Sequence, residues 1–241
     1  MDVLKDAMDD AAAECSLAVP SLFATNTQTS YVQLKRYMYS TARELLSRID
    51  WASCTLDETL TGDGTNVIAL PSDFGRVVRR DEEDGAAVWS DGMRRAFKPF
   101  NSNGEWTVVR SMGPTPSYGY RIVGSNIEFT QDIALGDTIT LSYVSKDWIS
   151  HASARAAEWT DDADLSYLPI RLIELGSVWR WRRKRGLEFS SYQGEFEIEL
   201  TRASNDDRSI RKIRFGQSPN NTGGSPYRNL PVPTLGPDPN I

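Results

Sequence analysis

The chain of 241 residues is long enough for one domain with a substantial core, or for a domain that carries an insertion. No apolar run approaches the roughly 18 residues needed to cross a bilayer, and the acidic start (Asp2, Asp6, Asp9, Asp10) is not typical of a signal or transit peptide. The net charge of -6 argues against a broad surface that grips a phosphate backbone.

Two helices are predicted in the first 54 residues. Residues 2–16 place small and apolar side chains on one side and acids on the other, and Pro20 ends this helical region. Thr27 to Ser30 offers N-cap residues for a longer helix, which ends at Asp50-Trp51. The apolar stripe of this second helix is spaced by three and four residues: Tyr31, Leu34, Met38, Ala42, Leu45 and Ile49. Because the link is short, the two helices are expected to pack side by side.

From Thr55 the periodicity is that of strands. Short strands are predicted over 55–61 and 66–70, with Gly62-Asp63-Gly64 as the turn between them. Residues 81–85 are a charged loop, and Asn101 to Gly104 indicates another turn.

The end of this region contains the clearest strand patterns. Gly124-Ser125-Asn126 is typical of a hairpin turn inside the segment 120–129. In the segment 138–143, three apolar residues alternate with Thr138, Thr140 and Ser142, which predicts a half-buried strand. The sequence therefore predicts an antiparallel sheet, arranged as a small sandwich, over 55–150.

Helical sequence returns after Thr160-Asp161-Asp162. These acids are expected at the N-terminal end of a helix and the bases of Arg180 to Arg185 at its C-terminal end, with Gly186 as C-cap. Pro169 fits only in the first turn, so the regular helix is expected to begin near Leu168. Residues 187–211 carry both a strand alternation and a helical spacing, and the longer window favours a helix.

The last segment, 217–241, differs from the rest because it holds six of the twelve prolines. It has too few bulky residues to bury a core of its own, so an extended arm is predicted. The resulting α+β organisation has N-terminal helices (1–54), a β-rich insertion (55–150), C-terminal helices (151–216) and the arm (217–241). The apolar residues of the arm are candidate anchors for docking on a partner: Tyr227, Leu230, Val232, Leu235 and Ile241.

The common catalytic and ligand-binding motifs are absent from the sequence. There is no phosphate-binding glycine loop, no His-Glu-x-x-His and no Gly-x-Ser-x-Gly. His151 is the only histidine and is expected at the surface near a junction of strand and helix. Cys15 and Cys54 indicate reduced thiols in a cytosolic protein. No catalytic, cofactor-binding or metal-binding residue is therefore assigned.

Two charged clusters have a second interpretation. The acids of 81–84 and of 158–164 could bind a divalent cation, although a solvated loop and a helix cap explain them better. Trp179 to Arg185 could stack on and pair with nucleic acid, whereas the preferred interpretation places the tryptophans in a core or subunit interface. From this cluster Arg180, Arg182, Arg183 and Arg185 are the candidates for salt links to another subunit or to a portal.

Four segments follow one another in a particular order: Leu70 to Val78 (Leu-Pro-Ser-Asp-Phe-Gly-Arg-Val-Val), the hairpin from Tyr120 to Phe129, Tyr143 to Ile149 (Tyr-Val-Ser-Lys-Asp-Trp-Ile) and the helix with Trp179-x-Trp181. This order resembles the head-to-tail adaptor proteins of tailed bacteriophages, the group that includes tail tubular protein A of podophages. The resemblance covers roughly Tyr31 to Gly216.

The resemblance implies a helical bundle with a β-rich insertion, no enzymatic activity and no cofactor. Copies of such proteins form a ring, usually of twelve, beneath the portal, and the ring extends the channel through which DNA leaves the head. The expected partners are other copies, the portal and a tail or nozzle protein, without a membrane and without specific DNA binding. The expected location is the neck or tail of the virion, and the host cytoplasm during assembly.

Three other functions remain open at this point. A neck-completion or tail-terminator subunit has the same general character, and six copies in the particle would favour it. A cell-wall hydrolase carried in the virion could use a pair of carboxylates from different segments. A nucleic-acid binder could use the helix around Trp179 to Arg185.

Overall fold

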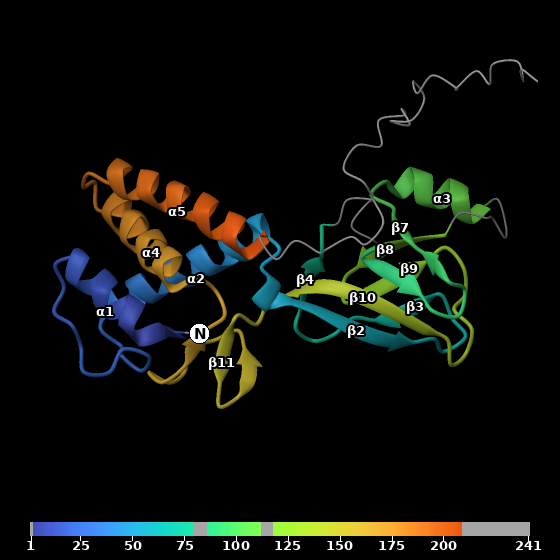
Figure 1. Ribbon diagram of the computed structural model, residues 1–241, viewed down its shortest axis with the longest axis horizontal. Coiled ribbons are helices and arrows are strands. Elements are labelled where there is room, and N and C mark those ends of the chain that lie inside the picture. The colour runs from blue at the N-terminus through green and yellow to red at the C-terminus, as the bar shows by residue number, and fades with distance from the viewer. Residues whose placement is uncertain (1, 80–85, 112–117, 209–241) are drawn as a thin grey trace, which may run out of the picture. The chain divides into compact units, whose positions relative to one another are not determined.

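The computed structural model describes residues 2–79, 86–111 and 118–208 (Figure 1). The predicted α+β fold is confirmed: helices gather around one core and antiparallel strands around another. The charged loop at 81–84 and the arm with Tyr227, Leu230, Val232, Leu235 and Ile241 lie outside the described residues. No helix within the described ranges has the length and apolar character needed to cross a membrane.

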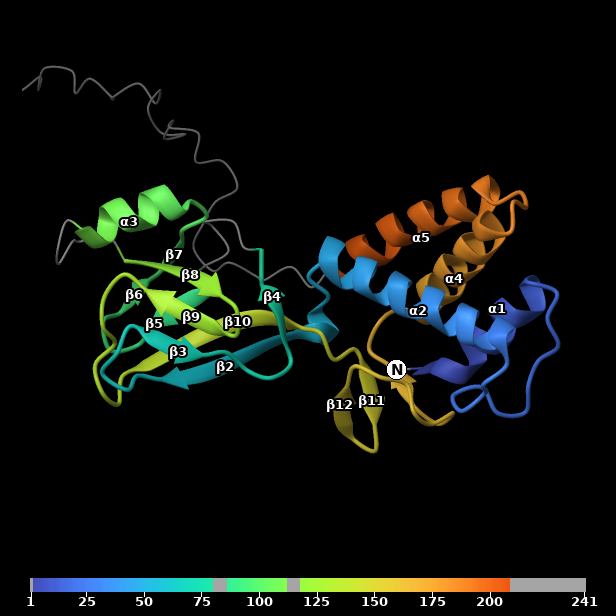
Figure 2. The ribbon, with the colours of Figure 1, turned by 180° about the vertical axis from the view of Figure 1, so that it is seen from behind.

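The helical part consists of α1 (Leu4–Glu14), α2 (Thr29–Arg48), α4 (Ile170–Lys184) and α5 (Ser190–Arg208). Helix α4 packs on both α1 and α2, so two predicted N-terminal helices and a C-terminal helix share one core (Figure 2). The predicted stripe of α2 is its buried face, as the spacing requires. The largest fully buried side chains of this core are Trp51, Phe23, Phe196, Leu4, Met8, Leu34, Met38 and Leu45.

Helices α2 and α4 approach closely at Gly176. A Cβ atom at this position would lie 2.2 Å from Cγ2 of Thr41 on α2, so only glycine allows this backbone separation. Thr41 is itself fully buried, and its hydroxyl donates a hydrogen bond to the carbonyl of Tyr37 at 2.8 Å. Helix α4 therefore keeps a glycine in its interior, despite the low helix propensity of glycine, because the packing against α2 requires it.

The helix ends agree only in part with the sequence. Gly186 has φ +69°, and the amides of Gly186 and Leu187 bond the carbonyls of Arg183 and Arg182, which is the Schellman ending that the glycine predicted. The predicted helix over 187–211 is observed as α5. The predicted acidic N-terminus of α4 is wrong, because α4 begins at Ile170 and the acids lie in the preceding loop. Helix α2 also begins without a side-chain cap from 27–30.

A small sheet completes the helical part. Its order is β1 (Asp2–Val3), β13 (Leu165–Ser166), β11 (Ile149–His151) and β12 (Ala154–Ala156), all antiparallel. Strand β11 crosses the boundary expected at 150, so the inserted region ends earlier, with β10 at Ser145. The chain thus enters the insertion after η1 (Ala52–Cys54) and returns to the helices through residues 146–148.

The two-residue turn between β11 and β12 is conformationally strained. Ala152 and Ser153 have φ +46° and +70°, values that cost an ordinary residue about 1 kcal/mol each. Replacing them together, Ala152→Asn and Ser153→Gly, is expected to raise the free energy of unfolding by about 1 kcal/mol in urea denaturation. Ser150→Gly, at an extended strand position, is the control and should lower it. A less stable double variant would contradict the assignment of the turn.

The inserted region is a sandwich of two sheets. One sheet has the order β2 (Thr55–Thr61), β10 (Thr138–Ser145), β5 (Val88–Ser90) and β6 (Arg95–Ala96), and β4 (Phe74–Val77) also pairs with β10. The other has the order β3 (Val67–Ala69), β9 (Asn126–Phe129), β8 (Gly119–Val123) and β7 (Lys98–Pro99). Their facing sides enclose a second core, of Leu60, Val88, Phe97, Tyr120, Ile127, Phe129, Ile133, Ile139, Leu141 and Tyr143.

The two short strands predicted over 55–61 and 66–70 are observed as β2 and β3. They belong to different sheets, so the residues Gly62 to Gly64 between them connect the two sheets. Two details of the sandwich depart from the prediction. Strand β7 pairs with β8 in parallel. Asn103 begins a helix, α3 (Asn103–Ser111), where a turn was expected. The predicted hairpin of β8 and β9 is confirmed, with Val123 opposite Asn126 and Gly124 at φ +60°.

Candidate functional site

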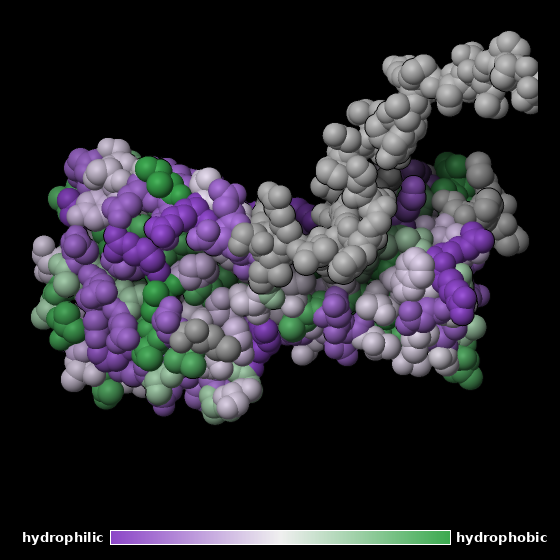
Figure 3. All heavy atoms as spheres, in the orientation of Figure 1, coloured by the Kyte–Doolittle hydropathy of each residue, from purple (hydrophilic) through white to green (hydrophobic). Residues whose placement is uncertain are grey.

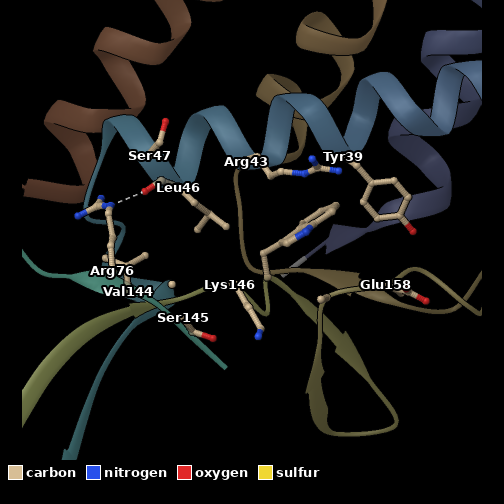
Figure 4. A pocket seen from close by; sticks show the side chains of 12 residues that line it. Tyr39, Arg43, Leu46, Ser47, Arg76, Val144, Ser145, Lys146 and Glu158 are labelled. Carbon is tan, nitrogen blue, oxygen red and sulfur yellow. Dashed lines mark hydrogen bonds between the residues drawn. The ribbon is translucent and has the colours of Figure 1, made fainter. Parts of the chain in front are cut away.

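An open groove lies between α2 and the end of the sheet formed by β4 and β10. Its volume is about 720 Å³, within the range of sites that bind a small molecule or a short peptide segment. Figure 4 shows Leu46 and Tyr39 pointing from α2 toward the strands; Leu46 lies opposite Val144, and Tyr39 lies further along α2, on the side of Glu158. The lining is completed by Arg43, Ser47, Gly75, Arg76, Lys146, Trp148, Ala157 and Glu158.

The floor of the groove is apolar and firmly held. Trp148 is buried and meets the ring of Tyr39 edge-on, with 6.2 Å between the ring centroids. The hydroxyl of Tyr39 accepts a hydrogen bond of 2.8 Å from the amide of Trp159. Burial raises the pKa of Tyr39, so this hydroxyl remains protonated and neutral at physiological pH. Leu46, Val144 and Trp148 are buried beneath the groove, so of these apolar residues mainly the partly exposed ring of Tyr39 is open to an occupant.

Arg76 ties the sandwich to the helices at one end of the groove. Its Nε donates to the carbonyl of Leu46 at 2.9 Å (Figure 4). Its Nη2 donates to the carbonyl of Ile49 at 3.1 Å, and Asp50 forms an ion pair with it. The guanidinium therefore satisfies carbonyls at the C-terminus of α2, where a cation is also favoured by the helix dipole. Asp50 accepts a further bond of 2.7 Å from the amide of Arg79.

The rim of the groove carries two exposed cations. Arg43 comes from α2 and Lys146 from the segment after β10, both are exposed, and neither forms an ion pair with any described residue. Glu158 lies at the far end of the lining. Ser145, the buried hydroxyl of the lining, donates to Asp73 at 2.8 Å. An apolar floor beside two exposed cations fits an apolar side chain that is flanked by carboxylates.

Arg180, predicted for a salt link to another subunit, lies inside the helical core. Its side chain is 11% exposed, pairs with Glu44 of α2, and donates to Oγ1 of Thr41 at 2.9 Å and to the carbonyl of Gly176 at 2.8 Å. The guanidinium also stacks over the ring of Trp179 at 4.2 Å. The prediction fails for Arg180 because this residue faces α2. The other three bases of the cluster follow Trp181, the last buried residue of α4.

Arg182, Arg183 and Arg185 lie at the end of α4. Each covers an aromatic ring, of Tyr192, Phe189 and Trp181 respectively, at 4.2–5.9 Å. Arg183 and Arg185 are exposed, so their charges are available to a partner. The tryptophans of this helix, Trp179 and Trp181, are buried in the core, as the preferred interpretation of the cluster expected.

Arg180→Ala is expected to lower the free energy of unfolding by about 2 kcal/mol, because the substitution removes charged hydrogen bonds in a nearly buried position. Arg183→Ala is the matched control on the same helix and should change it by less than about 0.5 kcal/mol. Urea denaturation followed by circular dichroism measures both. Equal losses in the two variants would contradict the distinction between an internal and a surface arginine.

The acids before α4 hold loops in place. Asp162 accepts hydrogen bonds from the amides of Phe23 (2.9 Å) and Ala24 (2.6 Å). Asp164 is buried and lies 2.7 Å from Nδ1 of His151, which is partly exposed at the end of β11. The histidine therefore lies near the surface, but it lies beside the turn between β11 and β12 and not beside a helix. Within the described ranges no three His, Cys, Asp or Glu side chains converge as metal ligands.

Both cysteines are unpaired. Burial raises the pKa of Cys15 to about 12 and that of Cys54 to about 11, so neither thiol is a reactive nucleophile at neutral pH.

No model of a known protein family matches the chain, and a search among curated proteins finds no match. The support for a function therefore comes from the residues and the fold. Reasoning from sequence missed the groove, because Arg43, Arg76 and Lys146 are separated along the chain and follow no motif. Only Arg76 and Lys146 lie within segments that carry the adaptor resemblance.

Proposed function

We propose that this chain is a structural virion subunit of the head-to-tail adaptor type. Copies form a ring, of twelve subunits, between the portal and the tail, and the ring extends the channel for DNA. The observation that supports this function most is the architecture: a helical bundle interrupted by an inserted β-sandwich, the arrangement that the sequence resemblance implies.

The positions of the four resembling segments add support. Leu70 to Val78 contains β4 and Arg76, the residue that ties the sandwich to the helices. Tyr143 to Ile149 links β10 to β11 through the floor of the groove. The hairpin of β8 and β9 closes the second core, and the two tryptophans of α4 fill the first. These segments therefore build the two cores and the junction between them, which are the parts that a shared fold needs.

The electrostatics suit a passive conduit. The net charge of -6 gives weak overall repulsion of DNA, so a duplex can pass without being held. In this proposal the arm from 217 to 241 docks on the portal or on a neighbouring subunit, and the exposed Arg183 and Arg185 offer salt links.

The decisive experiment mixes the purified chain with the portal protein of the same phage and determines the mass and symmetry of the complex. A ring of twelve copies on the portal is the expected result. Six copies would favour a completion or terminator subunit, and absence of any complex would overturn the adaptor function. Because rings of this kind can require the portal as a template, the chain alone is not the test.

Two further measurements separate the competing functions. Deletion of residues 217–241 is expected to leave the folded core intact and to abolish joining to the portal. Normal assembly of the truncated chain with the portal would contradict the docking role of the arm.

A zymogram with the full chain tests the hydrolase alternative. Clearing of peptidoglycan would overturn the structural function in favour of a cell-wall hydrolase.

A further inference from the structure

The end of the sandwich that is remote from the helices carries an unusual surface loop. Strands β9 and β10 are joined by residues 130–137, and Leu135 in this connection is 83% exposed, the highest value among the large hydrophobic side chains that the structure describes. Burying a leucine side chain is worth about 1.5–3 kcal/mol, so this exposure forgoes a considerable stabilisation. A single exposed leucine is common on protein surfaces, and Figure 3 shows apolar residues scattered among polar ones on the face that it draws. It is the rigidity of the loop and the charges around Leu135 that point to a contact with another molecule.

The loop is held rigidly against its neighbour, residues 62–65. The amides of Gly62 and Gly64 bond the carbonyls of Asp137 (2.7 Å) and Ile133 (3.0 Å), and the amides of Ile133 and Gly136 bond back to Thr65 and Gly62 at 2.9 Å. The side chain of Ile133 is fully buried in the sandwich core. We name residues 62–65 and 131–137 the acidic tip. Because it is preorganised, docking it would cost little conformational entropy.

The charges around Leu135 are mostly negative. Asp63 and Asp132 are exposed and Asp137 is partly exposed, while the adjoining turn adds Asp91 and Arg94. That turn is adjacent because Gly92 packs directly against the carboxylate of Asp137. Hydrogen bonds from the side chain and amide of Thr65 lower the pKa of Asp63, so it stays ionised at neutral pH. The tip therefore presents one apolar side chain among carboxylates.

This is the complement of the groove, which joins an apolar floor to the exposed cations Arg43 and Lys146. The two surfaces lie at opposite ends of β10, whose eight residues extend over roughly 25 Å, so they cannot meet within one chain. We propose that the acidic tip of one copy docks in the groove of the next copy. Leu135 contacts the floor at Tyr39 and Leu46, and the tip carboxylates face Arg43 and Lys146.

A contact between two different surfaces leaves a free groove on one copy and a free tip on the other. Such a heterologous contact repeats until a ring closes or a filament grows. The inference thus rests on the proposed ring and deepens it, because it names the surfaces through which neighbouring copies meet.

Disulfide trapping tests the contact directly. Chains with Leu135→Cys mixed with chains with Ser47→Cys, which lines the groove, are expected to form a cross-linked dimer under mild oxidation, alone or on the portal. Cys15 is partly exposed, so every chain in this experiment also carries Cys15→Ser, whereas Cys54 is buried and can remain. Thr59→Cys, exposed on β2, replaces Leu135→Cys in the control mixture and should give no dimer with the groove variant. Absence of the tip–groove dimer under both conditions would overturn the proposal.

A chain with both Leu135→Cys and Ser47→Cys distinguishes a repeating contact from a closed pair. It is expected to give a ladder of cross-linked species beyond the dimer. A product that stops at the dimer would overturn the head-to-tail arrangement.

Substitutions that disturb the contact should weaken association of the full chain, measured by sedimentation velocity with and without portal. Leu135→Asp is expected to raise the dissociation constant at least about tenfold, since the apolar contact is lost and a desolvated charge replaces it. Ile198→Asp on α5, where the isoleucine is 73% exposed, is the matched control and should have no effect. Equal association of the Leu135→Asp variant and the unchanged chain would overturn the contact.

A charge exchange gives a test that misfolding cannot imitate. Arg43→Asp should weaken association, and combining it with Asp132→Arg in the same chain should restore it in part, because the two exchanged positions again carry opposite charges across the contact. Failure of the combination to recover would overturn the proposed pairing.

The contact and the adaptor function fail in different ways. If rings form on the portal and Leu135→Asp leaves them unchanged, the contact is wrong and the adaptor function stands. If the tip–groove cross-link forms but the chain never joins a portal, the contact stands and the adaptor function is wrong.

Discussion

Phe129→Ala is expected to lower the free energy of unfolding of the sandwich by about 3–5 kcal/mol, the usual cost of removing a buried phenylalanine. Phe129 is fully buried at the end of β9 and meets the ring of Phe97 edge-on at a centroid distance of 4.9 Å. Its replacement leaves a cavity between the two sheets. Neither sheet can move to fill this cavity without breaking hydrogen bonds between its strands. Urea denaturation followed by far-ultraviolet circular dichroism measures the change.

Ile122→Ala on the paired strand β8 is the control, because that side chain is 37% exposed and its loss should cost less than about 1 kcal/mol. The two hydrophobic cores are separate, so the damage in the Phe129 variant should be confined to the sandwich. Fluorescence of the tryptophans buried in the helical core, such as Trp51 and Trp181, should then change at a higher urea concentration than the strand signal. A stability loss as small as that of the control would contradict the assigned core position.

Local patterns in the sequence were sufficient for several elements. The stripe of α2 could be predicted because a helix with one buried face must repeat its apolar residues every three to four positions. The hairpin of β8 and β9 and the end of α4 could be predicted because glycine reaches positive φ without strain, as Gly124 and Gly186 do.

Helix α3 was missed for a physical reason. Of its nine residues only Trp106 is buried, so the helix has no apolar stripe that a periodicity could reveal. It covers the outer side of the β8 sheet through this one tryptophan, over which Arg121 stacks at 4.6 Å. The residues Asn101 to Gly104, which include the first residues of α3, are typical of a turn and therefore predicted a turn instead of a helix.

The candidate site could not be predicted from the sequence because its contacts are made between distant parts of the chain. Asp162 resembled a helix cap, but its amide partners are at Phe23 and Ala24. Arg180 belonged to a run of bases that is typical of a surface, but Glu44 and Thr41 bind it from another helix. Residue type and spacing predict a helix face; they do not predict which distant side chain that face meets.

Asp164→Ala is expected to lower the free energy of unfolding by about 3 kcal/mol. Asp164 is 3% exposed, and one carboxylate oxygen accepts the amide hydrogens of Thr160 (3.1 Å) and Asp161 (3.0 Å), while the other faces Nδ1 of His151. An alanine removes the buried carboxylate that accepts these amides, which lie in an exposed loop, and each lost hydrogen bond to a charged group costs about 1.5 kcal/mol. Asp161→Ala, an exposed neighbour, is the control, and similar losses in both variants would contradict the special role of Asp164.

The same carboxylate predicts a dependence of stability on pH. Burial alone would raise the pKa of Asp164, but the hydrogen bonds from the Asp161 amide, His151 and the Thr160 amide outweigh it, so the pKa lies below the ordinary 3.8. A depressed pKa in the folded state means that the contribution of Asp164 is fully present above pH 3.8 and is lost as the pH falls through the folded value. Asp164→Asn keeps an oxygen that can accept the amides but cannot titrate. The difference in unfolding free energy between the unchanged chain and this variant should therefore be constant near neutral pH and shrink below pH 3.8; a difference that grows on acidification would contradict the assigned direction.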